Sequence, residues 1–211
     1  MTTIGFIGAG NIGQAVARLA LDHGYDVVLS NSRGPETLTD VVAGLGERAT
    51  ADTAEGAATR GDLVVVTVPF KAHDDVPVAP LAGKIVIDTN NYYPQRDGHV
   101  ADIDEGRTTS ASMLQQHLPE SRVVKAFNHI TSAHLTEHAL PAGREDRRAL
   151  AVAGDDTEAK ATVAALIDEL GFDIVDVGLL ADSWRIEPGT PGYGPRLDEA
   201  GLRDALAGAR R

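Results

Sequence analysis

The chain has 211 residues, a formal net charge of −12 and no cysteine. Its length fits one ordinary domain, or one domain with a small appended lobe. The negative charge argues against nucleic acid and anionic membranes as partners, and the lack of cysteine excludes disulfides and thiolate metal sites. No apolar run reaches the roughly 18 residues of a transmembrane helix, and the start lacks the basic stretch of a signal peptide. We therefore expect a cytoplasmic protein with no membrane partner.

Short apolar runs alternate with segments of helical periodicity along the chain. The runs predict strands at Thr3–Ile7, Asp26–Ser30, Arg48–Ala51, Leu63–Val68, Lys84–Asp88, Arg122–Phe127, Ala149–Gly154 and Phe172–Val177. Helices are expected after the first strand, from Pro35, and after Asp155 or Asp156. Because strands and helices alternate, and the runs are apolar almost continuously, we expect a parallel sheet covered by helices on both faces.

A glycine-rich turn follows the first predicted strand. Gly8-Ala9-Gly10-Asn11-Ile12-Gly13 matches G-x-G-x-x-G and opens a helix with apolar residues at i, i+3, i+4 and i+7. In a dinucleotide site, the first glycine allows the tight turn, the second admits the pyrophosphate, and the third lets the helix approach the strand. The pyrophosphate would lie on the helix N-terminus. The sequence therefore predicts dinucleotide binding at these six residues.

The end of the second predicted strand distinguishes NADP from NAD. NAD enzymes place an acidic residue there, about 20 positions past the glycines, to bind the ribose 2′-hydroxyl. This chain has Asn31, Ser32 and Arg33 instead, with no carboxylate before Glu36. A hydroxyl, an amide and a guanidinium suit a 2′-phosphate. The predicted cofactor is NADP(H).

These features predict a Rossmann-type, doubly wound α/β fold with a mainly parallel sheet and a small C-terminal α/β extension. We expect residues 1–128 to form the dinucleotide-binding domain. Residues 129–211 would form the extension that completes the sheet and the active-site cleft.

Later segments point to a family. Val124–Asn128, Ala151–Asp156, Gly178–Leu180 and Ser183–Arg185, together with the glycine turn and Asn31–Arg33, resemble the deazaflavin-dependent NADP oxidoreductases. These enzymes pass hydride between NADP and coenzyme F-420. The resemblance implies F-420 or a similar ring as co-substrate, and a homodimer. It also implies that Asn128 and Ser183 lie at the hydride-transfer site, with Val68, Pro69 and Ala126 lining the cofactor cleft.

Two other functions stay open: an NADPH-dependent reductase of a small imine or carbonyl compound, and a module that senses NADP(H) without turnover. An imine or carbonyl substrate requires a proton donor, for which Tyr92, Tyr93 and His129 are the candidates. A deazaflavin acceptor requires none. A polar, donor-bearing pocket would favour the imine or carbonyl, and a broad slot with basic residues would favour the deazaflavin.

One metal-binding pattern is set aside. His134-Leu135-Thr136-Glu137-His138 spells H-x-x-E-H, which is a zinc-protease pattern when a third ligand completes it. Nothing else in the sequence supplies a second acidic helix. We therefore predict no metal site and interpret the segment as a polar helix.

Overall fold

The computed structural model describes residues 2–211 and contains one eight-stranded sheet in the order β3-β2-β1-β4-β5-β6-β7-β8. The strands are β1 Thr3–Ile7, β2 Asp26–Ser30, β3 Ala49–Ala51, β4 Leu63–Val66, β5 Ile85–Asp88, β6 Arg122–Lys125, β7 Ala149–Gly154 and β8 Asp173–Gly178. All neighbouring pairs are parallel except β6 with β7. The predicted Rossmann-type, mainly parallel fold is confirmed.

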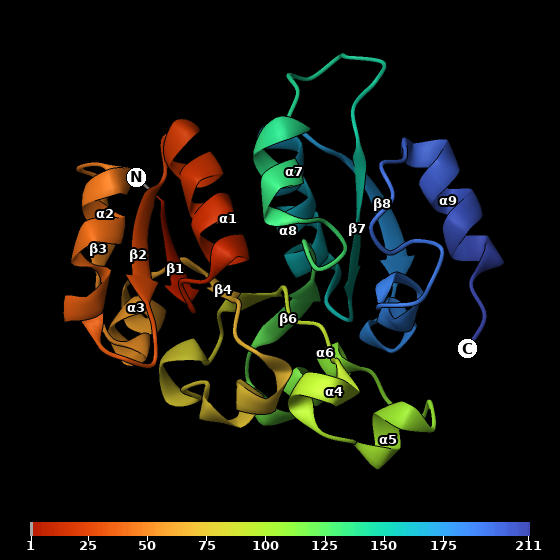
Figure 1. The fold of residues 1–211 in the computed structure, drawn as a ribbon, viewed down its shortest axis with the longest axis horizontal. Coiled ribbons are helices and arrows are strands. Elements are labelled where there is room, and N and C mark those ends of the chain that lie inside the picture. The colour runs from red at the N-terminus through yellow and green to blue at the C-terminus, as the bar shows by residue number, and fades with distance from the viewer. Residues whose placement is uncertain (1) are drawn as a thin grey trace.

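Helices cover both faces of this sheet (Figure 1). The longer ones are α1 Asn11–Asp22, α2 Thr39–Leu45, α3 Ala54–Arg60, α6 Ser110–His117, α7 Ser132–Glu137, α8 Thr157–Glu169 and α9 Glu199–Gly208. The helices α4 Pro94–Asp97 and α5 Ala101–Asp104 have one turn each, and the 3-10 segments are η1 Pro35–Leu38, η2 Phe70–Asp75, η3 Ala79–Leu81 and η4 Leu180–Ile186. None of the described helices combines the length and apolarity needed to cross a membrane.

The core has a layer on each side of the sheet. Helices α1, α7 and α8 pack on one face around Phe6, Leu29 and Phe172, so that a single cluster joins the first strand to the last part of the chain. On the other face α6 packs against β6, and its Leu114 belongs to a core cluster that also contains residues of β4 and β5. Helix α9 covers β7 and β8. Residues 149–178 therefore extend the same sheet, and the loop between α7 and β7 projects from the body (Figure 1).

Two strands end earlier than the sequence predicts. β6 stops at Lys125 rather than Phe127, because Phe127 has a φ of +59°, which a strand cannot accommodate. β4 stops at Val66 rather than Val68, before the segment that leads into Pro69 and η2. Both early ends lie at the carboxyl edge of the sheet, where ligands bind in open α/β sheets.

Candidate functional site

The three glycines of the turn between β1 and α1 lie in different steric environments. Gly8 has a φ of +109°, and a Cβ on it would lie 2.2 Å from the carbonyl oxygen of Thr67. A Cβ on Gly13 would lie 2.6 Å from the carbonyl oxygen of Gly8. At Gly10 a Cβ would meet no atom within 4 Å. Packing thus requires Gly8 and Gly13, whereas Gly10 borders open space.

The space beside Gly10 suits an anion. Gly10 is the N-cap of α1, where no side chain caps the first turn and no acidic residue lies in it. The first N–H groups of the helix and its dipole therefore favour negative charge at this point. The turn fits a dinucleotide pyrophosphate in shape and in charge.

A first cavity of about 440 Å³ continues from this turn to the end of β2. Its lining includes Gly8, Ala9, Gly10, Asn31, Ser32, Arg33, Val68 and Pro69. The Asn31 side chain accepts a hydrogen bond from the Arg33 N–H (2.9 Å) and donates one to Thr37 (2.9 Å), so it shapes the turn. Ser32 and Arg33 are exposed, and among residues 2–211 no partner occupies the Arg33 guanidinium.

A second cavity of about 360 Å³ lies over the carboxyl ends of β4, β5 and β6. It is lined by Asn11, Ile12, Thr67, Val68, Pro69, Thr89, Asn90, Asn91, Tyr93, Arg96, Phe127, Asn128, Ile130, Thr131 and Tyr193. Val68 and Pro69 line both cavities, which therefore adjoin across the carboxyl ends of β1 and β4 and are together called the cleft. The strand order reverses between these two strands, and dinucleotides bind at such a reversal.

The strained residue after β6 directs Asn128 into the second cavity. The positive φ of Phe127 turns the chain so that Asn128 faces the cleft while the Phe127 ring stays buried. The Asn128 Nδ2 donates to Asn91 Oδ1 (3.1 Å) and to the Ile186 carbonyl (2.8 Å). Asn128 therefore ties the strand end to η4 and to the segment after β5.

The buried His129 side chain lies between Asn128 and the backbone of β7. Its Nε2 accepts a hydrogen bond from the Ala151 N–H (3.1 Å), which leaves the proton on Nδ1 to face Asn128 Oδ1 at 3.4 Å. Burial, with the nearby charges of Arg148 and Lys125, lowers the pKa of His129 to about 3. The side chain is neutral and has no contact with the cavity, so it is not the proton donor that the sequence allowed.

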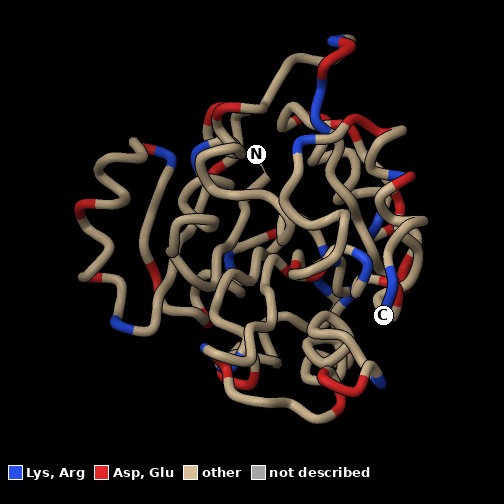
Figure 2. The backbone as a smooth tube through the Cα atoms, turned by 45° about the vertical axis from the view of Figure 1, so that its right-hand side comes forward, with Lys and Arg blue, Asp and Glu red and all other residues tan. Residues whose placement is uncertain are grey.

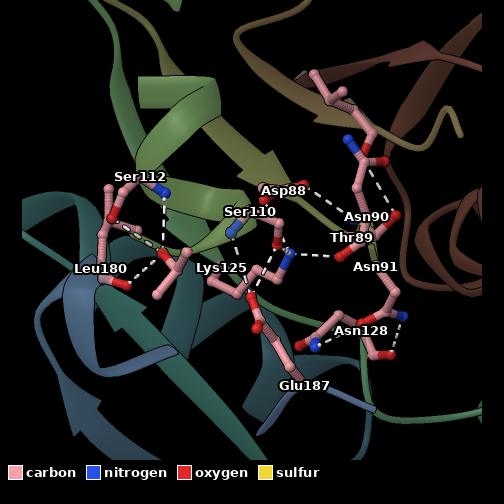
Figure 3. A network of polar contacts seen from close by, with 12 residues as sticks. Asp88, Thr89, Asn90, Asn91, Ser110, Ser112, Lys125, Asn128, Leu180 and Glu187 are labelled. Atoms are coloured by element: carbon pink, nitrogen blue, oxygen red, sulfur yellow. Dashed lines mark hydrogen bonds and ion pairs between the residues drawn. The ribbon is translucent and has the colours of Figure 1, made fainter. Parts of the chain in front are cut away.

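A buried ion pair anchors the floor of the cleft (Figure 3). The Lys125 Nζ at the end of β6 donates to Asp88 Oδ2 at the end of β5 (2.9 Å), to the Asn90 carbonyl, and to Ser110 Oγ (3.2 Å). Ser110 Oγ donates in turn to Glu187 beyond η4 (3.0 Å). The Asn90 side chain accepts from the Val68 N–H (3.0 Å), so the network fixes the wall shared by the two cavities.

Three predicted site residues do not line either cavity. Gly13 packs against the turn, and Ala126 is buried behind Phe127. Ser183 is buried in η4, and its hydroxyl has no hydrogen-bond partner within the described part of the chain. A direct role for Ser183 stays a prediction.

Sequence reasoning missed Lys125, Asp88 and Tyr193. A lysine and an aspartate at the ends of two apolar strands were a usable signal, since buried charges occur in pairs. Tyr193 carried no signal, because its place in the second cavity depends on contacts with residues about a hundred positions earlier.

The H-x-x-E-H segment forms α7, and it brings ligand atoms of His134, Glu137 and His138 within 4.8 Å of one another. The Arg148 Nη1 lies 3.2 Å from His138 Nδ1 and 3.4 Å from His134 Nδ1. Burial, with the neighbouring charges of His134, Arg148 and Arg196, lowers the pKa of His138. A guanidinium beside both rings opposes a cation there, so the geometry does not favour a metal.

Acidic and basic residues are interspersed along the chain, with no single basic region (Figure 2). Because the net charge is −12, an anionic ligand is attracted by local groups such as Arg33 rather than by an overall field.

The cleft, the glycine turn and the strand order define a Rossmann-type dinucleotide-binding protein. Residues 3–92 match the family described as NADP oxidoreductase, coenzyme F420-dependent. This match covers fewer than half of the 211 residues, and over that part it confirms the family resemblance that the sequence predicted.

Metalloreductase STEAP3 of Rattus norvegicus is 30% identical over 188 residues, which are 87% of this chain and 35% of STEAP3. YjhV of Escherichia coli K12 is 45% identical over 60 residues, which are 28% of this chain and 44% of YjhV. The chain thus spans less than half the length of these relatives.

Solved structures share the fold over most of the chain. The hypothetical protein SMa0349 from Sinorhizobium meliloti has a TM-score of 0.81 and 33% identity, covering 94% of this chain and 96% of its own. A candidate F420-dependent NADP reductase from Arthrobacter sp. FB24 has a TM-score of 0.74 and 24% identity, covering 87% of each chain. At that identity the second likeness concerns the fold alone.

Proposed function

We propose that this protein is an NADPH-dependent oxidoreductase that transfers hydride between NADPH and a deazaflavin (F-420) or flavin-like ring. One observation carries the proposal: a cavity that extends from exposed Ser32 and Arg33 past the open space at Gly10 adjoins a second cavity over the carboxyl ends of β4, β5 and β6. The match of residues 3–92 to the coenzyme F420-dependent family supports the choice of acceptor.

The residues divide the binding task by their chemistry. Ser32 and Arg33 are free to hold a 2′-phosphate, and the α1 N-terminus accepts a pyrophosphate. Ile12, Val68 and Pro69 offer apolar surface in the second cavity for a nicotinamide ring. NADPH supplies hydride from C4 of that ring. The chain's part is to hold the ring against the acceptor and to exclude water.

A second candidate is reduction of a small imine or carbonyl compound. The observation that favours it is the polar lining of the second cavity, with the amides of Asn91 and Asn128 and the phenols of Tyr93 and Tyr193. The only guanidinium in that lining, Arg96, is paired with Asp97 (2.8 Å), so the cavity lacks the free basic residues of a slot for an anionic ring. The existence of the cavity counts against a module that only senses the nucleotide.

An NADPH-oxidation screen tests the proposal. Purified protein is mixed with NADPH and, in separate reactions, F-420, riboflavin, a cyclic imine and an α-keto ester. We expect oxidation with F-420 or riboflavin, and no oxidation by a Gly10→Val variant, which keeps the fold and loses the nucleotide site. Failure of every acceptor, with NADPH bound, would contradict an oxidoreductase function. Oxidation with the imine or the keto ester alone would select the second candidate.

A further inference from the structure

Two tyrosine hydroxyls touch inside the second cavity. Tyr93 Oη and Tyr193 Oη are 2.5 Å apart, although the residues are 100 positions apart in the chain. Tyr93 precedes α4, and Tyr193 lies in the loop between η4 and α9. Both line the cavity that also contains Ile12 and Val68, beside the proposed nicotinamide position.

Tyr93 is fixed by its neighbours. Its N–H donates to Asp97 Oδ2 (2.9 Å), and the Arg96 guanidinium lies 4.9 Å from the centre of its ring. Arg96 donates two hydrogen bonds to the Asp97 carboxylate (2.9 and 2.8 Å) and one to the Asn91 carbonyl (2.7 Å). A guanidinium that is itself paired with Asp97 is therefore packed over the Tyr93 ring and holds it in place.

Tyr193 is placed to donate to Tyr93. The Asn91 Nδ2 donates to Tyr193 Oη (3.5 Å) and cannot accept, so the proton of Tyr193 is left free to be donated to Tyr93. Burial, with the hydrogen bond to Tyr93, raises the pKa of Tyr193 above its ordinary value. Tyr193 therefore keeps its proton, and the proton of Tyr93 remains available to a molecule in the cavity.

The other predicted acids are occupied elsewhere. Tyr92 Oη donates to Asp104 Oδ1 (2.8 Å) and accepts from the Val100 N–H (3.0 Å), and Tyr92 does not line this cavity. His129 is a buried, neutral acceptor at Nε2. Among the sequence's candidate acids, only Tyr93 lies where a substrate can reach it.

We propose that Tyr93 is a catalytic proton donor for a small imine or carbonyl substrate, and that Tyr193 positions it and stabilises the phenolate left behind. The inference rests on the second candidate of the proposed function, which is NADPH-dependent reduction of an imine or carbonyl compound. Hydride adds to the carbon of the C=N or C=O bond, and the two π electrons become a lone pair on nitrogen or oxygen. That atom takes the proton from Tyr93 Oη, and water reprotonates the phenolate. The products are an amine or alcohol and NADP⁺.

The test compares three conservative variants: Tyr93→Phe, Tyr193→Phe, and Tyr25→Phe as a matched control. Tyr25 loses the same hydroxyl but bonds Glu169, away from the cleft. The probes are methylpyrroline as imine, ethyl pyruvate as carbonyl, and F-420. We expect Tyr93→Phe to lower kcat for an imine or carbonyl probe by about 10²–10⁴-fold. The NADPH affinity of Tyr93→Phe, measured by fluorescence titration, should stay within about twofold of wild type. In Tyr25→Phe both kcat and NADPH affinity should stay within about twofold of wild type.

Tyr193→Phe distinguishes positioning from packing. Without the Tyr193 hydroxyl, the phenolate loses its hydrogen-bond donor, so the alkaline limb of the kcat/KM pH profile should move to higher pH while kcat falls. The groups facing this pair are Arg96, Asp97 and Asn91, and none of them is changed by the variant. An unmoved alkaline limb would overturn the assigned role of Tyr193.

Two further outcomes separate this inference from the proposed function. In the first outcome, wild type reduces neither methylpyrroline nor ethyl pyruvate, and the Tyr93→Phe variant reduces F-420 at the wild-type rate. That outcome would overturn the proton-donor role of Tyr93 and support the deazaflavin reaction. NADPH oxidation with none of the three probes would contradict the proposed function itself.

Discussion

The buried ion pair between Lys125 and Asp88 should contribute strongly to stability, because neither side chain has contact with water. Their exposed fractions are 0% and 1%. A Lys125→Met variant keeps the length of the side chain but leaves the Asp88 carboxylate and the Asn90 carbonyl without their cation. Removing one partner of a buried pair costs about 3–5 kcal/mol. For a chain of this size that free energy corresponds to a fall in Tm of about 6–20 °C.

Urea unfolding followed by circular dichroism measures this cost. The matched control is Lys160→Met, because its partner Asp176 is 57% exposed and stays hydrated when the lysine is removed, so this variant should lose less stability than Lys125→Met. The double variant Lys125→Met, Asp88→Asn should lose less stability than the sum of the single variants, since it removes both charges. A cost below about 1 kcal/mol for Lys125→Met would refute the reasoning.

Three further predictions follow from the site. Gly10→Val should fold, because the φ of −76° at Gly10 suits valine and a Cβ there meets no atom within 4 Å, yet it should lose nucleotide binding. Gly8→Ala should lower the free energy of unfolding by at least about 1 kcal/mol, because the φ of Gly8 is +109°. Circular dichroism with nucleotide titration separates the two effects, and a Gly10→Val protein that still binds NADPH would contradict the prediction. His129, with a pKa near 3 when folded and about 6.5 when unfolded, adds stability at neutral pH that is lost as pH falls from about 6.5 toward 3, by up to about 1.4 kcal/mol per pH unit. Urea unfolding at pH 7.5 and pH 5 should show a shallower fall for His129→Gln, and equal slopes would contradict it. Asn128→Ala should lower turnover more than NADPH affinity, measured by steady-state kinetics and titration, because it detaches Asn91 without touching the adenosine end; an equal loss of both would count against that assignment.

Much of the fold could be predicted because local signals agree with it. Thr3–Ile7, Asp26–Ser30 and Ala149–Gly154 have the predicted bounds, since each is a short apolar run between a turn and a helix. The Asp156 cap was also predictable, and its carboxylate accepts from the Ala159 N–H (2.7 Å). The segment from Pro35 was expected to form one helix, but it divides into η1 and α2. The spacing of apolar residues does not distinguish a 3-10 turn from the α-helix that follows it.

The cofactor side of the site was more predictable than the acceptor side. The glycine turn and the end of β2 are contiguous in sequence, and their chemistry depends on residues a few positions apart. The second cavity is assembled from β4, β5, β6 and the loop after η4, so its contents depend on long-range packing. The contact of Tyr93 with Tyr193, and the strain at Phe127 that aims Asn128, follow from tertiary structure and left no pattern to find.

Titration of NADPH and NADH into wild type and an Arg33→Ala variant tests the central claim most directly. Arg33 is exposed at the first cavity with a free guanidinium, and a charge-assisted hydrogen bond contributes about 1.5–3 kcal/mol. The variant should then bind NADPH about 10- to 150-fold more weakly, with NADH affinity little changed. Arg203→Ala, at an exposed residue on α9 paired with Glu199, serves as the control and should bind both as wild type does. Wild type that binds NADH more tightly than NADPH, or an Arg33→Ala variant with unchanged NADPH affinity, would contradict the account.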